Sequence, residues 1–384
     1  MGKDKSIKDS AFIISRSDSV LVTGANGFIG AKVVQTLLEY GFNNIKCLVR
    51  SSGNLTLLKK AISINPAKVE LITGDLLSPE DCNMAIKDSR LVYHLAAVMR
   101  DTVFESSHLN NVQTTINLLN GIFQHDSVRR FVNVSSFVVY SNMNLHRGAL
   151  LDETCEREPD PVGRGDAYCN SKILQEDWVV NKCKQHGLSH VIVRPAIVYG
   201  PDHEGIHRMV GRSKDFGPFR VFMHLGGSNI LPLSYVDNCA EAIVLAGLKS
   251  GVDGEVFNVV DDDLITSREF ISQYKRNVKK ILSINLSFKS FYIFSCCWEV
   301  CFNKINPRLS KKFNRKKASH YYKGNQYSNA KLKKLLGWEP KVARSEALNR
   351  YFEYQKLFGN DRELKLHRKC FVPDANKRPP NVNM

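Results

Sequence analysis

A glycine-rich turn between an apolar run and a helical pattern constrains the fold of this chain more than any other feature. The turn reads TGANGFIG (23–30); the apolar run SVLV precedes it, and AKVVQTLLEY follows it with helical spacing and ends before Gly41. Glycines there allow a tight bend and let backbone N–H groups approach an anion, while the start of a helix favours negative charge. The strand–turn–helix context therefore predicts a dinucleotide-binding loop.

Short apolar runs continue to alternate with helical stretches as far as about residue 200. The runs are IKCLVR (45–50), VELITGD (69–75), LVYHLAA (91–97), RFVNVSS (130–136) and HVIVRPAIVYG (190–200). This alternation predicts an α/β protein with a doubly wound parallel sheet (Rossmann fold) and helices on both faces. Beyond about residue 201 the pattern breaks down, which predicts a smaller C-terminal substrate-binding cap.

The same alternation of apolar runs and helical stretches predicts how the chain divides into regions. We expect an N-terminal extension (1–17), a dinucleotide-binding domain (18–200), a mainly substrate-binding region (201–360) in which 235–260 returns to the first domain, and a flexible tail (361–384).

Cysteine usage and charge narrow the class of protein. The ten cysteines are scattered with no Cys-x-x-Cys pair, which favours reduced thiols in the cytoplasm and predicts no metal site. The formal net charge is +16, and basic residues concentrate at 275–280 and 304–317. No motif of the common nucleic-acid-binding modules is present in the sequence, so we expect a small-molecule substrate and no nucleic-acid partner.

The aromatic segment 286–302 has two interpretations. It reads LSFKSFYIFSCCWEVCF and is interrupted by Lys289 and Glu299, so it is too short and too polar for a membrane-spanning helix. A buried helix of the substrate-binding region is one interpretation. An interfacial helix is the other, and with the nearby basic residues it would place the protein peripherally at a membrane surface.

The stretch AYCNSK (167–172) places a tyrosine four positions before a lysine. On a helix, Tyr168 and Lys172 would share a face, and an ammonium group lowers the pKa of a neighbouring phenol because it favours the phenolate. The spacing suits a tyrosine that transfers a proton near neutral pH.

The end of the second apolar run bears on which dinucleotide would bind. An acidic residue there would bind the ribose 2′-hydroxyl of NAD, but the sequence is CLVRSSGN, with Arg50 followed by two serines. Since an arginine can pair with a 2′-phosphate, the sequence favours NADP(H) over NAD(H).

These features together resemble the extended short-chain dehydrogenase/reductase family, also called the NAD-dependent epimerase/dehydratase superfamily. The resemblance covers roughly residues 18–360. Its motifs occur in order: TGANGFIG (23–30), GDL (74–76), HLAA (94–97), NVQTTINLL (111–119), VSSFVVY (134–140), YCNSK (168–172), RPAIVYGP (194–201), YVDNCAEAI (235–243) and LGWEPKV (336–342).

The resemblance implies a role for each matching residue. Tyr168 and Lys172 match the acid–base pair, Ser136 the hydroxyl that orients substrate, and Asn111 the asparagine of the family's helix. The residues implied to bind the cofactor are Gly24, Asn26, Gly27, Phe28, Ile29, Gly30, Arg50, Asp75, Leu76, Ala96, Ala97, Tyr168 and Lys172. By analogy with the family, a homodimer is also expected.

The resemblance leaves the substrate open. RPAIVYGP, YVDN and the aromatic segment 286–302 look like the 3β-hydroxysteroid dehydrogenase and dihydroflavonol reductase branch, which implies a dehydrogenase or reductase acting on a lipophilic secondary alcohol or ketone. The alternative is a nucleotide-sugar epimerase or reductase of polysaccharide biosynthesis, to which the tail YSNAKLKKLLGWEPKV is similar. A dinucleotide-binding regulator without catalysis is the third interpretation, and the presence of Ser136, Tyr168 and Lys172 argues against it.

Overall fold

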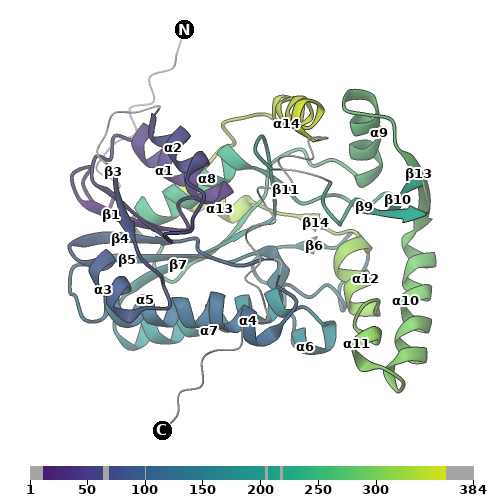
Figure 1. The fold of residues 1–384 in the computed structure, drawn as a ribbon, viewed down its shortest axis with the longest axis horizontal. Coiled ribbons are helices and arrows are strands. Elements are labelled where there is room, and N and C mark those ends of the chain that lie inside the picture. The colour runs from purple at the N-terminus through teal and green to yellow at the C-terminus, as the bar shows by residue number, and fades with distance from the viewer. Residues whose placement is uncertain (1–11, 64–68, 100, 204–205, 217–218, 360–384) are drawn as a thin grey trace.

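A parallel sheet of seven strands forms the centre of the molecule in the computed structural model, which describes residues 12–63, 69–99, 101–203, 206–216 and 219–359 (Figure 1). All neighbours in this sheet pair in parallel, in the order β12-β7-β5-β4-β1-β2-β3. The strands are β1 (Ser19–Thr23), β2 (Ile45–Val49), β3 (Val69–Thr73), β4 (Ser89–His94), β5 (Arg130–Val134), β7 (Ser189–Pro195) and β12 (Val256–Val259). The predicted doubly wound α/β fold is confirmed.

Helices cover both faces of this sheet, because the central strands are apolar on both sides. On one face lie α1 (Phe28–Glu39), α2 (Thr56–Ser63), α8 (Val236–Leu248) and α13 (Ala330–Leu336). On the other lie α3 (Pro79–Ile86), α4 (Phe104–His108), the π-helix η2 (Leu109–Gln113), α5 (Thr114–Ile122) and α7 (Ala167–Gln185). The segment 235–260 thus supplies α8 and β12 to this layered unit.

A second unit of mixed structure stands beyond the carboxyl ends of the strands (Figure 1). Its three-stranded sheet has the order β13-β10-β9 and consists of β9 (Gly211–Phe216), β10 (Phe219–Gly226) and β13 (Leu282–Ser287). Its helices are α6 (Pro161–Arg164), α9 (Ser267–Asn277), α10 (Phe288–Asn303), α11 (Pro307–Ser310), α12 (Arg315–Tyr322) and α14 (Arg344–Phe358). An aromatic core that includes Phe270, Tyr274, Tyr351 and Phe352 holds α9 against α14.

Two pairs of short strands join the units. The residues 190–200 read as one run in the sequence, but the structure divides them after Pro195, and β8 (Ile197–Tyr199) pairs with β11 (Leu233–Tyr235) instead of extending the main sheet. The second pair is β6 (Leu150–Leu151) with β14 (Gln326–Tyr327).

The aromatic segment forms α10, which lies along the edge of the second unit. Within its span only Ser295 is fully buried, so the interpretation as a buried helix is wrong. In the part of the chain that the structure describes, no helix has the length and apolar character needed to cross a membrane. The expected tail (361–384) and most of the N-terminal extension lie outside the described residues.

Candidate active site

A cavity of about 680 Å³ opens between the two units and runs from the glycine-rich loop to α12. At one end it is lined by Gly24, Gly27 and Gly30, and in its middle by Ser136, Tyr168 and Lys172. Side chains of the second unit line the far end, among them Arg208 and Tyr321. The cavity lies beyond the carboxyl ends of parallel strands, where ligands bind in open α/β sheets.

The glycine loop has the shape that a dinucleotide requires. Gly24 has φ +70°, and a Cβ there would lie 2.7 Å from the backbone nitrogen of Ala96. A Cβ on Gly30 would lie 2.0 Å from the carbonyl oxygen of Gly24. Both glycines are therefore needed to close the turn at the start of α1, whose N-terminus favours the negative charge of a pyrophosphate. A cavity that joins this loop to Tyr168 fits an extended dinucleotide.

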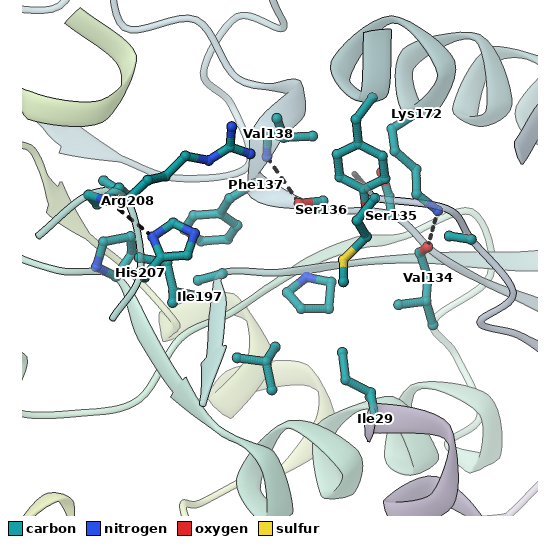
Figure 2. A pocket seen from close by; sticks show the side chains of 18 of the residues that line it. Ile29, Val134, Ser135, Ser136, Phe137, Val138, Lys172, Ile197, His207 and Arg208 are labelled. Carbon is teal, nitrogen blue, oxygen red and sulfur yellow. Dashed lines mark hydrogen bonds between the residues drawn. The ribbon is translucent and has the colours of Figure 1, made fainter. Parts of the chain in front are cut away.

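Helix α7 carries the tyrosine and the lysine, and both side chains line the cavity. Figure 2 shows Lys172 beside Val134. The helix begins at the Asp166 cap, whose side chain accepts a hydrogen bond from the backbone N–H of Cys169. The Lys172 ammonium nitrogen lies 5.9 Å from the centre of the Tyr168 ring, so the two side chains share a face as the spacing predicts. Lys172 donates to the carbonyl oxygen of Val134 and to Oε1 of Gln175, each at 2.8 Å.

Burial dominates the electrostatics of this pair. It raises the pKa of Tyr168 well above that of a free phenol, although a hydrogen bond with Ser136 and the charge of Arg208 lower it. It also lowers the pKa of Lys172 to about 7, against the opposing effect of Glu176. Without cofactor, the pKa of Tyr168 is raised because loss of hydration outweighs the effects of Ser136 and Arg208. That Lys172 and a bound oxidised cofactor together lower this pKa stays a prediction.

Ser136 is held at the start of the short 3₁₀-helix η3 (Phe137–Val139). Its hydroxyl accepts a hydrogen bond from the backbone N–H of Val138 at 3.2 Å. The buried guanidinium of Arg164 supports the same loop, because it donates to the carbonyl oxygens of Val138 and Tyr140 at 2.6 and 3.1 Å. These bonds place the serine hydroxyl beside the phenol.

Asn111 lies behind the cavity, at the centre of the π-helix, and does not line the cavity wall. Its Oδ1 accepts from the backbone N–H of Val98 at 2.7 Å, and its Nδ2 donates to the Val98 carbonyl and to Oγ of Ser171 at 3.1 and 2.9 Å. It therefore ties the loop after β4 to α7. π-Helical turns inside α-helices are frequent at functional sites.

A buried polar network extends from Lys172 to the glycine loop. Gln175 accepts from Lys172 and donates to Oγ1 of Thr115 at 2.6 Å. Thr115 in turn contacts Nε2 of His94 at 2.9 Å, while Nδ1 of His94 lies 2.7 Å from Oγ1 of Thr23. Burial lowers the pKa of His94 to about 3, so its ring is neutral and Lys172 is the member of the network that can carry a positive charge.

The remaining predicted residues lie along the cofactor end. Phe28, Ile29 and Ala97 line the cavity, whereas Asn26, Arg50, Asp75, Leu76 and Ala96 do not. Asn26 donates to the carbonyl of Asn54, and Arg50 is exposed directly after β2. The Asp75 carboxylate accepts from the backbone N–H of Leu77 at the end of β3.

The sequence did not identify the residues at the far end of the cavity. Arg208 and Tyr321 belong to segments widely separated in the chain, and neither has a neighbouring motif that marks it. Gln175 was also missed, although it lies one helical turn after Lys172 on the same face, a spacing that could have indicated a partner.

Comparison with known proteins defines the class. The model of the NAD dependent epimerase/dehydratase family matches residues 20–259, so the chain belongs to this family, as the sequence motifs predicted. It is an NAD(P)-dependent enzyme of the dehydrogenase, reductase or epimerase kind.

Two relatives are similar over most of their length. The chain is 27% identical over 350 residues to a 3-beta-hydroxysteroid dehydrogenase of Mycolicibacterium neoaurum, covering 87% of this chain and 90% of the relative. It is 26% identical over 354 residues to the decarboxylating sterol-4-alpha-carboxylate 3-dehydrogenase of Saccharomyces cerevisiae, covering 88% and 97%. Among solved structures, a UDP-glucuronic acid 4-epimerase of Bacillus cereus bound to NAD superposes with a TM-score of 0.65 at 21% identity, covering 89% of this chain and 98% of the other. That last similarity concerns the fold alone.

Proposed function

We propose that the enzyme transfers hydride between a nicotinamide cofactor and a secondary alcohol or ketone on a lipophilic, sterol-like molecule. The observation that carries the proposal is the single cavity that leads from the glycine loop past Ser136, Tyr168 and Lys172 to a wall containing Phe137 and Met209. The similarity to relatives named for hydroxysteroid and sterol substrates supports the same substrate class.

Each residue of the centre has a distinct part. The dinucleotide, when bound between the glycine loop and Lys172, supplies or accepts the hydride. Tyr168 exchanges the hydroxyl proton, and Ser136 holds the substrate oxygen by a hydrogen bond. With its raised pKa, Tyr168 is neutral at pH 7 and is ready to donate a proton to a forming alkoxide. The oxidative direction requires positive charge beside the phenolate, and Lys172 supplies part of it.

Substitution of Tyr168 tests this assignment. Tyr168→Phe removes the exchangeable proton but keeps the ring, so turnover of a 3β-hydroxysteroid should fall at least about a thousandfold, within the range for loss of a positioned acid or base. Cofactor binding, followed by fluorescence titration, should stay within about threefold of wild type. Turnover that survives in Tyr168→Phe would refute the mechanism. Efficient conversion of nucleotide sugars by a protein that retains its cofactor would instead support the epimerase alternative.

For the cofactor we propose a preference for NADP(H), supported by Arg50. It is exposed at the carboxyl end of β2, and no acidic residue follows it in the adjoining sequence, which continues Ser51-Ser52-Gly53. Arg50→Ala should weaken NADPH binding by roughly 10- to 100-fold and leave NADH binding unchanged. Equal affinity of the wild type for the two cofactors would contradict the preference.

We also propose that the outer face of α10 touches an anionic membrane surface, which places a cytoplasmic protein beside a lipophilic substrate. Ile293 and Val300 on this face are 63% and 76% exposed, and Cys297 between them is exposed as well. Lys289 and Lys304 are exposed at the two ends of the same stripe. An apolar stripe with flanking cations suits the interface between headgroups and acyl chains.

A further inference from the structure

The far end of the cavity carries a cation and an unused hydroxyl close to the reaction centre. The guanidinium carbon of Arg208 lies 4.7 Å from the centre of the Tyr321 ring, a cation–π contact that helps to hold the guanidinium at this wall. Figure 2 shows the Arg208 side chain extending across the pocket toward Val138 and Ser136.

Tyr321 supplies the second observation. Its side chain is 5% exposed and lines the cavity, yet its hydroxyl has no hydrogen-bond partner among the described residues. A buried hydroxyl without a partner is costly, so a ligand group that accepts its hydrogen bond would be favoured. The phenol donates most strongly to an ionised acceptor.

The charges around this wall favour a negatively charged ligand. Among the residues that line the cavity, the acidic side chain is Asp101, and its carboxylate already accepts a hydrogen bond from the backbone N–H of Val103. The neighbouring His207 and His320 are neutral, because burial and the charge of Arg208 lower the pKa of each. Arg208 is therefore the cation of this wall.

The position of Arg208 relative to the reaction centre determines where on the substrate the anionic group must lie. Because the Arg208 side chain reaches toward Val138 and Ser136 (Figure 2), the guanidinium faces the reaction centre and not the remote end of a long molecule. A planar guanidinium with one adjacent hydroxyl matches a single carboxylate.

We propose that Arg208 and Tyr321 form an oxyanion subsite that selects substrates carrying a carboxylate near the secondary hydroxyl. The proposal rests on the proposed function. Within the proposed class of sterol-like alcohols, it predicts that the enzyme prefers acidic substrates to neutral ones. Arg208 positions the substrate and takes no part in proton or hydride transfer. The reaction is otherwise unchanged: the carbinol C–H bond breaks with its electron pair passing to the nicotinamide, and the O–H proton passes to the phenolate of Tyr168.

The experiment compares matched substrates on matched variants. A 3β-hydroxysteroid bearing a 4α-carboxylate and its counterpart without the carboxylate are assayed with wild type, Arg208→Gln, Arg208→Lys and Tyr321→Phe. Arg90→Gln, an exposed arginine on β4 outside the cavity lining, is the charge-matched control. Arg208→Gln should lower kcat/KM for the acid by roughly 10- to 100-fold more than for the neutral alcohol, whose smaller loss reflects only the weaker stabilisation of the Tyr168 phenolate. Arg208→Lys should recover part of the loss, and Tyr321→Phe should show a smaller loss with the same selectivity.

Binding measurements separate this proposal from the proposed function. Calorimetric titration of the acid into the protein with cofactor present does not need turnover, so loss of binding in Arg208→Gln supports the subsite even if neither steroid is oxidised. Equal losses for acid and neutral substrates, or no preference of the wild type for the acid, would overturn it. Tight binding of UDP that disappears in Arg208→Gln would also overturn it, because the anion would then be a phosphate.

Discussion

At the scale of single residues, the burial of Lys172, the proposed partner of Tyr168, disfavours the charge that this role requires. Lys172 is fully buried, and its pKa of about 7 means that much of the protein carries it uncharged at neutral pH. The fall from the ordinary value of 10.5 corresponds to about 5 kcal/mol of differential stabilisation. The bonds to Val134 and Gln175 offset part of this cost, and bound substrate and cofactor would have to supply more.

This imbalance predicts that Lys172→Met removes activity and raises stability at low pH. Between pH 7 and 10.5 the unfolded chain binds the proton that the folded chain has lost, so the wild type gains stability as pH rises through this window. Below pH 7 the cost of the buried ammonium is fully present. The variant should therefore exceed the wild type by about 1–3 kcal/mol at pH 6, and the difference should vanish or reverse at pH 10, where neutral lysine still donates its hydrogen bonds.

Urea unfolding at the two pH values measures this difference. Lys289→Met, which changes an exposed lysine on α10, should show no such dependence on pH. A variant less stable than wild type at pH 6 would contradict the argument.

At the scale of elements, the approach of α1 to the turn after β1 depends on Gly30. A Cβ there would meet the backbone of Gly24, which cannot move without opening the turn. Gly30→Ala should cost about 1–3 kcal/mol and weaken dinucleotide binding at least about tenfold. Gly121→Ala in α5 is the matched control, because its Cβ would meet only the end of the Ile86 side chain, which can change rotamer. Unaltered cofactor titration curves for Gly30→Ala would contradict this role of the glycine.

Helices and strands were predictable from the sequence where neighbouring residues determine their conformation. The strand, turn and helix around TGANGFIG, and the Tyr168–Lys172 face of α7, follow from glycine positions and helical spacing. The break after Pro195 was not predictable, because β8 leaves the main sheet only to pair with Leu233–Tyr235, a distant segment. Arg208 and Tyr321 were missed for the same reason: their proximity exists only once the second unit has folded over the sheet.

At the scale of the whole molecule, the far wall of the cavity and α10 belong to the same second unit, whose helices α11 and α12 lie beside α10 (Figure 1). Helix α12 carries Tyr321 to the cavity, while the opposite side of this cluster presents the apolar stripe of α10. An enzyme resting on a membrane through α10 would thus keep its substrate end near the lipid phase from which a sterol-like molecule arrives.

The membrane contact predicts that charge on α10 releases the protein from vesicles. Ile293→Glu with Val300→Glu replaces exposed apolar side chains with carboxylates, which should remove their insertion energy and repel anionic headgroups. Partitioning onto vesicles of phosphatidylcholine with phosphatidylserine, measured by co-sedimentation, should fall at least about tenfold.

The wild type should also bind less as salt increases, since salt screens the attraction of Lys289 and Lys304 to the anionic headgroups. Met84→Glu with Leu357→Glu, two exposed apolar positions on α3 and α14, is the control and should leave binding unchanged. An equal loss in the control, or equal binding of wild type to vesicles without phosphatidylserine, would exclude α10 as an electrostatically assisted contact.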